Sequence, residues 1–237
     1  MSRVLVKTHC FLGDFICSEP ALRAICKKHH NDEIIVQSVF GDFLKWYPYT
    51  IRIVSKPEPA DIEYKLICDG NSNLVTKVAE LNQLTISDLI PDLNIPIQTS
   101  HKEPYYVICA EASTKERHWS EDNWESLVDR LDAPVIQVGK WNKVQIKNAD
   151  TSMLGKVLLP DELATLIFHA KSFITVDTGL SHFAASIKKP YIVLMDKVPI
   201  SWRNHCGYTI SIHKHDIKKI TVEDVLFATT QYIGKHD

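Results

Sequence analysis

The sequence predicts an α/β protein made of two domains, each built on a parallel sheet. In both halves of the chain, short apolar runs rich in β-branched residues alternate with segments of helical periodicity, as in βαβ units. A proline-containing stretch without clean periodicity, near residues 89–103, separates the halves. The 237 residues are 45% apolar and 24% charged, a composition that excludes a disordered chain.

The first half alternates four predicted strands with helical patterns. The strands are Arg3–Lys7, Glu33–Gln37, Ile51–Val54 and Lys65–Cys68. The helix expected between the first two strands has an apolar face made of Ala21, Leu22, Ile25 and Cys26. Pro20 suits the first turn of this helix, because the N–H that proline lacks would be unpaired there. A second helical pattern covers Asn73–Leu84, and we expect residues 1–98 to form the first domain.

The second half repeats this alternation, and we expect residues 99–237 to form the second domain. Its predicted strands are Tyr105–Ala110, Val135–Val138, Phe173–Val176 and Tyr191–Leu194. Helices are predicted after the N-cap residue Ser120, near Pro160, after Gly179 and after a capping box at Thr221 and Asp224. Their apolar positions are Trp124, Leu127, Val128 and Leu131; Leu163, Leu166, Ile167 and Ala170; and Val222, Val225, Leu226 and Ile233. Packing of the last helix back on the first domain stays open.

Charge and cysteine content restrict the partners only a little. The 27 basic and 29 acidic residues give a formal net charge of −2, so the whole chain offers no positive field to nucleic acid. The cysteines form no C-x-x-C pair and are expected to be reduced: Cys10, Cys17, Cys26, Cys68, Cys109 and Cys206. Without a cleavable apolar leader or a long apolar run, the chain is expected to be cytoplasmic with no transmembrane segment.

Several familiar motifs are absent from the strand-to-helix loops, where open α/β sheets bind their ligands. The sequence lacks G-x-G-x-x-G, G-x-x-x-x-G-K-[ST], G-x-S-x-G and H-E-x-x-H, which disfavours nicotinamide, P-loop, serine-hydrolase and zincin chemistry. It also lacks D-x-D. The histidine pairs His29/His30 and His213/His215 have the composition of solvated surface, so we expect no metal and no other cofactor.

The loop after the first strand carries an acidic residue near a helix start. It reads Leu12, Gly13, Asp14 and Phe15, followed by Ser18 and Pro20. Asp14 would lie at the mouth of the sheet. An N-cap role is the simpler alternative, since aspartate is among the best caps.

A second polar loop follows the strand Tyr105–Ala110 and runs from Glu111 to Trp119. It offers the hydroxyls of Ser113 and Thr114 and the cations of Lys115 and Arg117, which together suit a phosphate. A solvated loop is the alternative. Trp119 counts against that alternative, because a large aromatic side chain beside the charges is expected to cover a ligand.

A third loop follows the strand Phe173–Val176 and reads Asp177, Thr178, Gly179, Leu180, Ser181 and His182. Gly179 removes side-chain bulk at a helix N-terminus, where the N–H groups and the helix dipole favour an anion. Asp177 would instead accept hydrogen bonds from ligand hydroxyls. Helix capping by Asp177 and Thr178 and a packed role for His182 are the alternatives.

Taken in order, residues 13–22, 113–121 and 176–185 resemble the heptosyltransferase family of glycosyltransferases, family 9. The resemblance runs through nearly the whole chain, and its third segment is the most specific. It implies a GT-B fold, with two Rossmann-like domains facing a central cleft, and an inverting transfer that needs no metal. The first domain would hold the acceptor and the second a nucleotide-diphosphate sugar, typically ADP-heptose.

The resemblance also implies roles for single residues. Asp14 matches the catalytic base, and Gly13 and Ser18 in the same segment are expected to bind substrate. The other expected substrate-binding positions are Ser113, Thr114, Lys115, Arg117, Asp177, Thr178, Gly179 and His182. Among them, the hydroxyls of Ser113 and Thr114 match diphosphate ligands, and Asp177 matches the carboxylate that holds the sugar hydroxyls.

Two departures from the family pattern bear on substrate choice. The chain is shorter than usual members, which predicts trimmed acceptor-side loops. After the strand Val135–Val138, the family tends to have a W-G segment and then a glutamate that binds ribose. This sequence instead continues Gly139, Lys140, Trp141, and its next glutamate is Glu162.

Two alternative functions therefore stay open. One is a phage-type enzyme that glycosylates hydroxylated bases of DNA, with phosphate contacts from Lys27, Lys28, His29, His30 and Lys214–Lys219. The other is a non-catalytic sugar-nucleotide-binding module.

Overall fold

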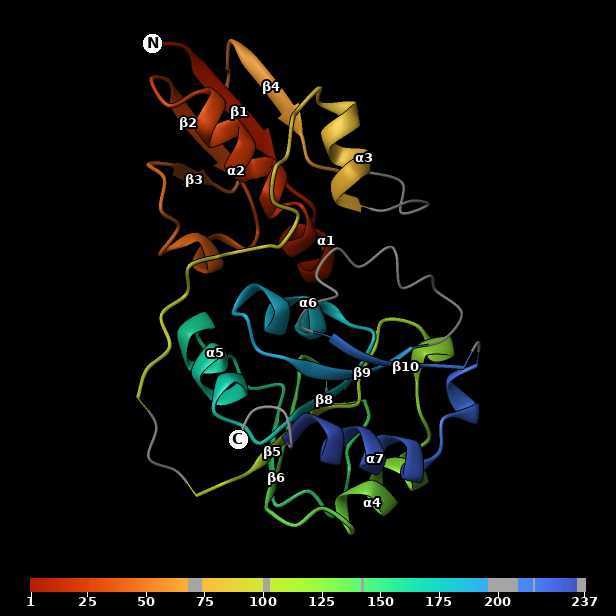
Figure 1. The fold of residues 1–237 in the computed structure, drawn as a ribbon. Helices are drawn as coiled ribbons and strands as arrows, with labels where there is room; N and C mark the ends of the chain where they lie inside the picture. Colours follow the sequence, from red (N-terminus) through yellow and green to blue (C-terminus); the bar gives the residue numbers. More distant parts are fainter. Residues whose placement is uncertain (68–73, 100–102, 142, 196–208, 215, 234–237) are drawn as a thin grey trace. The chain divides into compact units, whose positions relative to one another are not determined.

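A computed structural model describes residues 1–67, 74–99, 103–141, 143–195, 209–214 and 216–233 (Figure 1). Among these residues the chain forms two compact units, one ending at Pro96 and one beginning at Ile97. This division falls inside the proline-containing stretch of the sequence. Four positions discussed above lie outside the described residues: Cys68, Asn73, Cys206 and His215.

The first unit is a parallel sheet with helices packed on one another beside it (Figure 1). Its strands are β1 (Arg3–Lys7), β2 (Glu33–Gln37), β3 (Arg52–Val54) and β4 (Ile62–Lys65), in the spatial order β3-β2-β1-β4. The register pairs Val4 with Ile34 on one side and with Ile62 on the other. Because β1 is flanked on both sides, its residues Val4, Leu5 and Val6 are buried.

Three α-helices complete this unit. They are α1 (Leu12–Cys17), α2 (Glu19–Lys28) and α3 (Leu74–Leu81), with a short 3₁₀ helix, η1 (Gly41–Leu44). Pro20 lies at the start of α2, and the predicted apolar face of α2 is buried, which confirms both expectations. Cys17 and Cys26 are buried free thiols in this unit, whereas Cys10 is exposed.

The second unit is a six-stranded parallel sheet. Its strands are β5 (Tyr106–Cys109), β6 (Val135–Gly139), β7 (Thr151–Leu154), β8 (Phe173–Val176), β9 (Tyr191–Met195) and β10 (Thr209–His213). The spatial order is β10-β9-β8-β5-β6-β7. Read from its other edge, this is the doubly wound order 3-2-1-4-5-6 of Rossmann-like sheets, and the first unit has the corresponding 3-2-1-4 half. The predicted α/β class with parallel sheets is confirmed.

Helices cover the second sheet in two pairs. α4 (Glu121–Val128) packs on α7 (Val222–Ile233), and α5 (Pro160–Phe168) packs on α6 (Gly179–Ser186), on the opposite side of the sheet (Figure 1). Short 3₁₀ helices lie at η2 (Lys115–Arg117) and η5 (Ile217–Lys219). The caps are as predicted: the Ser120 hydroxyl accepts from the Asn123 N–H, and Asp224 and Thr221 form the capping box of α7. The last helix therefore packs within the second unit.

The structure differs from the sequence prediction at one strand and, besides the 3₁₀ helices, adds one α-helix and two strands. β4 is Ile62–Lys65, so the predicted strand Lys65–Cys68 was wrong. Pairing with β1 decides this position, because Val4 to Lys7 match Ile62 to Lys65. The apolar run that follows β4 buries Leu66 without being part of the strand. The elements missed were α1, the edge strand β7 and the strand β10.

Candidate functional site

The three polar loops follow the central strands of the two sheets. β1 lies between β2 and β4, and β5 lies between β6 and β8, so both strands sit where the winding of their sheet reverses direction. Ligands of open α/β sheets bind beyond the carboxyl ends of strands at such switch points. Asp14 follows β1, and the loops at residues 111–119 and 177–182 follow β5 and β8. The topology thus places each predicted loop where a ligand site is expected.

Asp14 is in the first turn of α1, and its side chain is 41% exposed. The N-cap of this helix is Phe11, which has no side-chain capping bond, so the N-cap alternative for Asp14 was wrong. The carboxylate atom Oδ2 lies 3.4 Å from Nδ1 of His9, a contact that the sequence did not reveal. Gly13, beside Asp14, is partly exposed. The carboxylate is therefore open to solvent.

Ser18 has a structural contact. It is 1% exposed, and its hydroxyl donates to the carbonyl of Phe15 at 2.8 Å. Its backbone N–H reaches the carbonyls of Asp14 and Phe15 at 3.0 and 3.1 Å. In this structure Ser18 holds the junction between α1 and α2, which fixes the turn that carries Asp14. A contact between Ser18 and substrate stays a prediction.

The loop after β5 exposes the predicted phosphate ligands. Ser113, Thr114 and Lys115 are exposed, and Thr114 has the extended backbone that begins η2. Trp119 does not join them, because it is 1% exposed and its indole N–H donates to the carbonyl of Ile220 at 2.8 Å. Its ring packs edge-on against Trp124 in the core of this unit. The expectation that Trp119 covers a ligand was wrong.

An ion pair joins the second and third loops. A guanidinium nitrogen of Arg117 lies 3.4 Å from Oδ2 of Asp177. The Asp177 side chain is 10% exposed and that of Arg117 is 34% exposed. β5 and β8 are neighbours, with Val107 opposite Phe173, so the ends of these two strands bring the loops together. Predicted site residues that are about 60 positions apart in sequence thus form one polar cluster.

The start of α6 presents backbone N–H groups beside this cluster. Thr178 is the N-cap with an extended backbone, and its side chain makes no capping bond. The Ser181 hydroxyl donates to the Thr178 carbonyl at 2.6 Å. Gly179 and His182 are partly exposed. Because the dipole of a helix favours negative charge at its N-terminus, this position suits a phosphate.

Glu111 is a buried carboxylate whose role the sequence analysis missed. It is 3% exposed, and its two oxygens accept from the N–H groups of Trp141 at 2.8 Å and Lys143 at 2.9 Å. A Cβ on Gly139 would lie 2.7 Å from Oε2 of Glu111, so only glycine leaves room for this arrangement. The one available signal was its position at the end of β5.

The loop that Glu111 holds carries an exposed aromatic side chain between two cations. Trp141 is 39% exposed. The ammonium groups of Lys140 and Lys143 lie 5.6 and 5.4 Å from the centre of its ring. The far end of this loop is held by the buried side-chain amide of Gln137. Its nitrogen donates to the carbonyl of Val144, and its oxygen accepts from the N–H of Ile146. This loop follows β6 and is the second unit's third polar loop at the carboxyl ends of its strands.

The comparison with known proteins identifies the family. Residues 76–198, more than half of the chain, match the family described as Glycosyltransferase family 9 (heptosyltransferase). The chain belongs to glycosyltransferase family 9. The matched segment contains the loops after β5, β6 and β8, but it begins after Asp14 and so does not include it.

A curated heptosyltransferase is also similar to this chain. Lipopolysaccharide heptosyltransferase 1 of Salmonella typhimurium is 27% identical over 106 residues, which cover 41% of this chain and 33% of that protein. The chain therefore matches only a third of the length of this curated relative.

Solved family 9 structures share the fold over almost the whole chain. The glycosyl transferase family 9 protein from Veillonella parvula superimposes with a TM-score of 0.80 at 14% identity, covering 99% of this chain and 97% of that one. E. coli heptosyltransferase WaaC, solved with ADP-2-deoxy-2-fluoro heptose, gives a TM-score of 0.69 at 13% identity, with 99% and 100% covered. The expected GT-B fold is confirmed.

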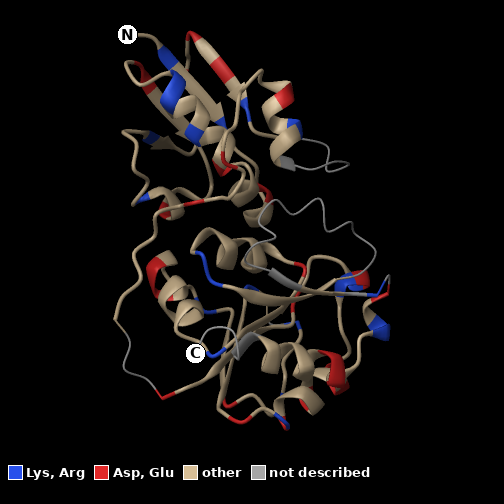
Figure 2. Cartoon of the chain, viewed as in Figure 1, with Lys and Arg blue, Asp and Glu red and all other residues tan. Residues whose placement is uncertain are grey.

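Other features of this family 9 chain bear on the open alternatives. Lysines and arginines are interspersed with acidic residues along the described elements (Figure 2). His29, proposed as a DNA contact, is 9% exposed and bonds Asp32 and Tyr64, and Lys214 pairs with Asp224. Within the described ranges, no three His, Cys, Asp or Glu side chains group as metal ligands, and no helix combines the length and apolar content needed to cross a bilayer.

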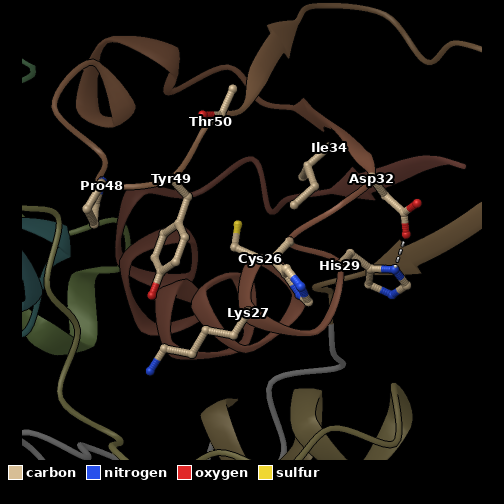
Figure 3. Close-up of a pocket in the computed structure, with 9 residues that line it drawn as sticks. Cys26, Lys27, His29, Asp32, Ile34, Pro48, Tyr49 and Thr50 are labelled. Atoms are coloured by element: carbon tan, nitrogen blue, oxygen red, sulfur yellow. Dashed lines mark hydrogen bonds and ion pairs between the residues drawn. The ribbon is translucent and has the colours of Figure 1, made fainter. Parts of the chain in front are cut away.

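A cavity of about 450 Å³ lies in the first unit. Cys26, Tyr49 and Thr50 are among its lining residues, and the bond from His29 to Asp32 lies at its rim (Figure 3). The wall comes from the end of α2 and the start of β2, at the amino edge of the sheet, whereas Asp14 follows the carboxyl end of β1. Within the first unit, the cavity is therefore separate from Asp14.

Proposed function

We propose that this chain is an inverting glycosyltransferase that moves a sugar from a nucleotide-diphosphate sugar to an acceptor hydroxyl without a metal ion. The observation that carries the proposal is the ion pair between Arg117 and Asp177, which gathers two family 9 loops at the switch point of the second sheet. The second unit (residues 99–237 in the sequence-based division) would bind the donor. The first unit (residues 1–98) would bind the acceptor.

The donor end of the reaction needs positive charge and hydrogen-bond donors. As the bond from the anomeric carbon to the diphosphate breaks, negative charge develops on the leaving oxygen. Lys115, Arg117 and the N–H groups at Gly179 would stabilise that charge, and the hydroxyls of Ser113 and Thr114 would bond the phosphates. Asp177 would accept from hydroxyls of the sugar. ADP-heptose is the first donor to test, because WaaC was solved with an ADP-linked heptose analogue.

The acceptor end needs a base. Asp14 would take the proton from the acceptor hydroxyl while its oxygen attacks the anomeric carbon from the side opposite the diphosphate, which inverts that centre. General-base catalysis of this kind contributes about 10²- to 10⁴-fold in rate. The exposed carboxylate in the first turn of α1 supports this assignment.

The first test is donor binding measured by thermal shift. A panel of nucleotide-diphosphate sugars, with ADP-heptose among them, is added to the full chain. A donor at 100 times its Kd stabilises the folded state by about 2.7 kcal/mol, so a clear rise in unfolding temperature is expected for the correct nucleotide. An unchanged unfolding temperature across the panel at millimolar concentration would contradict the proposal.

The second test replaces Asp14 by Asn. We expect D14N to lose transfer by about 10²- to 10⁴-fold and to keep the donor-induced thermal shift. Transfer is measured as ADP release from ADP-heptose, with heptose-free lipopolysaccharide core oligosaccharide or DNA containing hydroxymethylated bases as acceptor. Undiminished transfer by D14N would show that Asp14 is not the base. Loss of wild-type activity on treatment with a chelator would contradict metal independence.

A further inference from the structure

His9 lies between the end of β1 and the start of α1, five residues before Asp14. Its side chain is 13% exposed, and its ring lies 5.7 Å from the exposed ring of Phe11. The atom Nδ1 is buried and has no hydrogen-bond partner within the described part of the chain. Oδ2 of Asp14 lies 3.4 Å from this nitrogen. A buried ring nitrogen therefore faces the carboxylate assigned as the base.

This contact is close without being a formed hydrogen bond. Leaving a buried polar atom unpaired destabilises the folded state, so such atoms in folded proteins usually have a partner or a function. Hydrogen bonds among catalytic groups are often long or poorly aligned before substrate binds and tighten afterwards. At 3.4 Å, the distance from Nδ1 of His9 to Oδ2 of Asp14 is long in this sense.

The proton position on the ring follows from the neighbouring charge. With the proton on Nδ1, the imidazole donates toward Oδ2 of the carboxylate. With the proton on Nε2 alone, the lone pair of Nδ1 would face the lone pairs of Oδ2 and repel them. A ring that carries a proton on Nδ1 is thus the form that fits the carboxylate of Asp14.

We propose that His9 is a positioning residue for Asp14, donating from Nδ1 to Oδ2 so that Oδ1 is directed at the acceptor hydroxyl. This inference rests on the proposed function, in which Asp14 is the base. The acceptor proton moves to Asp14, and His9 keeps its own proton throughout, so no bond to His9 is made or lost. A base held by a third group in this way follows the logic of nucleophile, base and orienting residue in other enzymes.

The test compares His9→Leu with His9→Asn in the ADP-release assay, with ADP-heptose and heptose-free core oligosaccharide. An asparagine amide nitrogen reaches the position of Nδ1 and can donate, whereas leucine cannot. We expect H9L to lower kcat by about 10- to 100-fold, as misplacement of a catalytic group does, with little change in KM for the donor. H9N should stay within about threefold of wild type. Equal loss in the two variants would overturn the inference.

A double-mutant cycle separates positioning from general damage to the fold. If His9 acts through Asp14, H9L should lower the residual rate of D14N no further, because the group that it positions has gone. A loss in D14N as large as in wild type would overturn the inference. So would unchanged kcat in H9L when D14N is impaired, and this result would leave the proposed function intact. Absence of transfer by the wild-type protein would instead overturn both.

Discussion

At the scale of single residues, Glu19 is an ionisable group that is buried in the first unit. It is 2% exposed and accepts from the Tyr47 hydroxyl at 2.8 Å and from the backbone N–H of Asp92 at 2.9 Å. Arg23 lies one turn further along α2, at 3.3 Å. Burial raises the pKa of the Glu19 carboxyl from 4.5 to about 7, and the Arg23 guanidinium only partly opposes this effect. Glu19 thus makes the stability of the protein depend on pH.

We expect Glu19 to make the protein less stable as pH rises from about 4.5 to about 7. In this window the folded state keeps a proton that the unfolded state has lost, so the free energy of unfolding falls with rising pH. Below the window both states are protonated, and above it both are ionised. Each unit of pKa difference corresponds to about 1.4 kcal/mol.

Urea unfolding of wild type and Glu19→Gln at pH 4, 5.5 and 8 measures this effect. The amide keeps an acceptor for the Asp92 N–H but does not titrate, so the pH dependence should be flatter in E19Q by on the order of a few kcal/mol across the window. Identical pH dependence in the two proteins would contradict the assignment to Glu19.

Single residues were predictable where they follow a buried strand. Asp14, Arg117 and Asp177 were identified as site residues in this way, although their roles stay predictions. His9 and Glu111 also follow buried strands, but their roles were missed because their burial and their contacts with other residues cannot be read from the sequence. Trp119 shows the opposite error, since a tryptophan beside charges in sequence turned out to belong to the core.

At the scale of elements, the loop after β6 is defined by buried acceptors. Glu111 reaches across from the end of β5 to the backbone of Trp141 and Lys143. Gln137 fixes the other end of the loop from within β6. Such pairing with buried side chains holds the backbone at Trp141, Lys143 and Ile146 without secondary structure.

Replacing Glu111 by Ala should release this loop. Buried N–H groups that lose their acceptor cost about 1–3 kcal/mol, so the free energy of unfolding should fall by that amount. Amide hydrogen exchange at Trp141 and Lys143 should accelerate, and the emission of tryptophan should change as Trp141 moves.

The matched control is Glu116→Ala, which removes an exposed carboxylate from the same strand-to-helix loop. It should leave the unfolding free energy within about 0.5 kcal/mol of wild type, as is usual for surface positions. Equal effects of E111A and E116A would show that the loop does not depend on Glu111.

Central strands were predictable, whereas three edge strands, β4, β7 and β10, were misplaced or missed. β5, β8 and β9 are fully buried runs of apolar residues, and such runs have a clear strand signal. The edge strand β7 is partly exposed, and β4 alternates exposed charges with Tyr64, so their signals are weak. α1 has six residues that include Gly13, too few to establish helical periodicity.

At the scale of the whole molecule, the segment that joins the units is fastened at both ends. On the first unit, Arg23 bonds the carbonyl of Ile90 at 2.8 Å and the carboxylate of Asp88 at 3.2 Å. On the second unit, Gln98 bonds Thr165 at 3.0 Å and Asp161 at 3.0 Å, both in α5. Only the residues between Ile90 and Gln98 lie between these two sets of anchoring bonds.

Arg23→Ala should loosen the first of these anchors. Residues 88–90 would lose their bonds to Arg23, so their amide exchange and their cleavage by added protease should accelerate, while exchange near Gln98 stays unchanged. Arg52→Ala is the control, because it removes an arginine that pairs with Glu33 and Glu58 on the surface of the same unit. Equal protection of residues 88–90 in wild type and R23A would contradict the anchoring role.

The fold of the whole chain was predictable because strand and helix alternate in both halves, and the strand orders confirm it. The family match in sequence lies mainly in the second unit, whereas the structural match covers 99% of the chain. Tertiary structure therefore retains a similarity in the first unit that its sequence expresses only in short segments. The facing of the two domains across a cleft stays a prediction.

The purely parallel pairing of both sheets has a consequence for how the protein folds. Val107 must find Ile136 on one side and Phe173 on the other, and no hairpin can bring such distant residues together. Each strand pair closes a long loop and loses chain entropy before its hydrogen bonds form. Chains with this kind of connectivity fold slowly, in about milliseconds to seconds, and expose apolar strands in the meantime. Recovery of this protein after dilution from denaturant should accordingly fall as protein concentration rises.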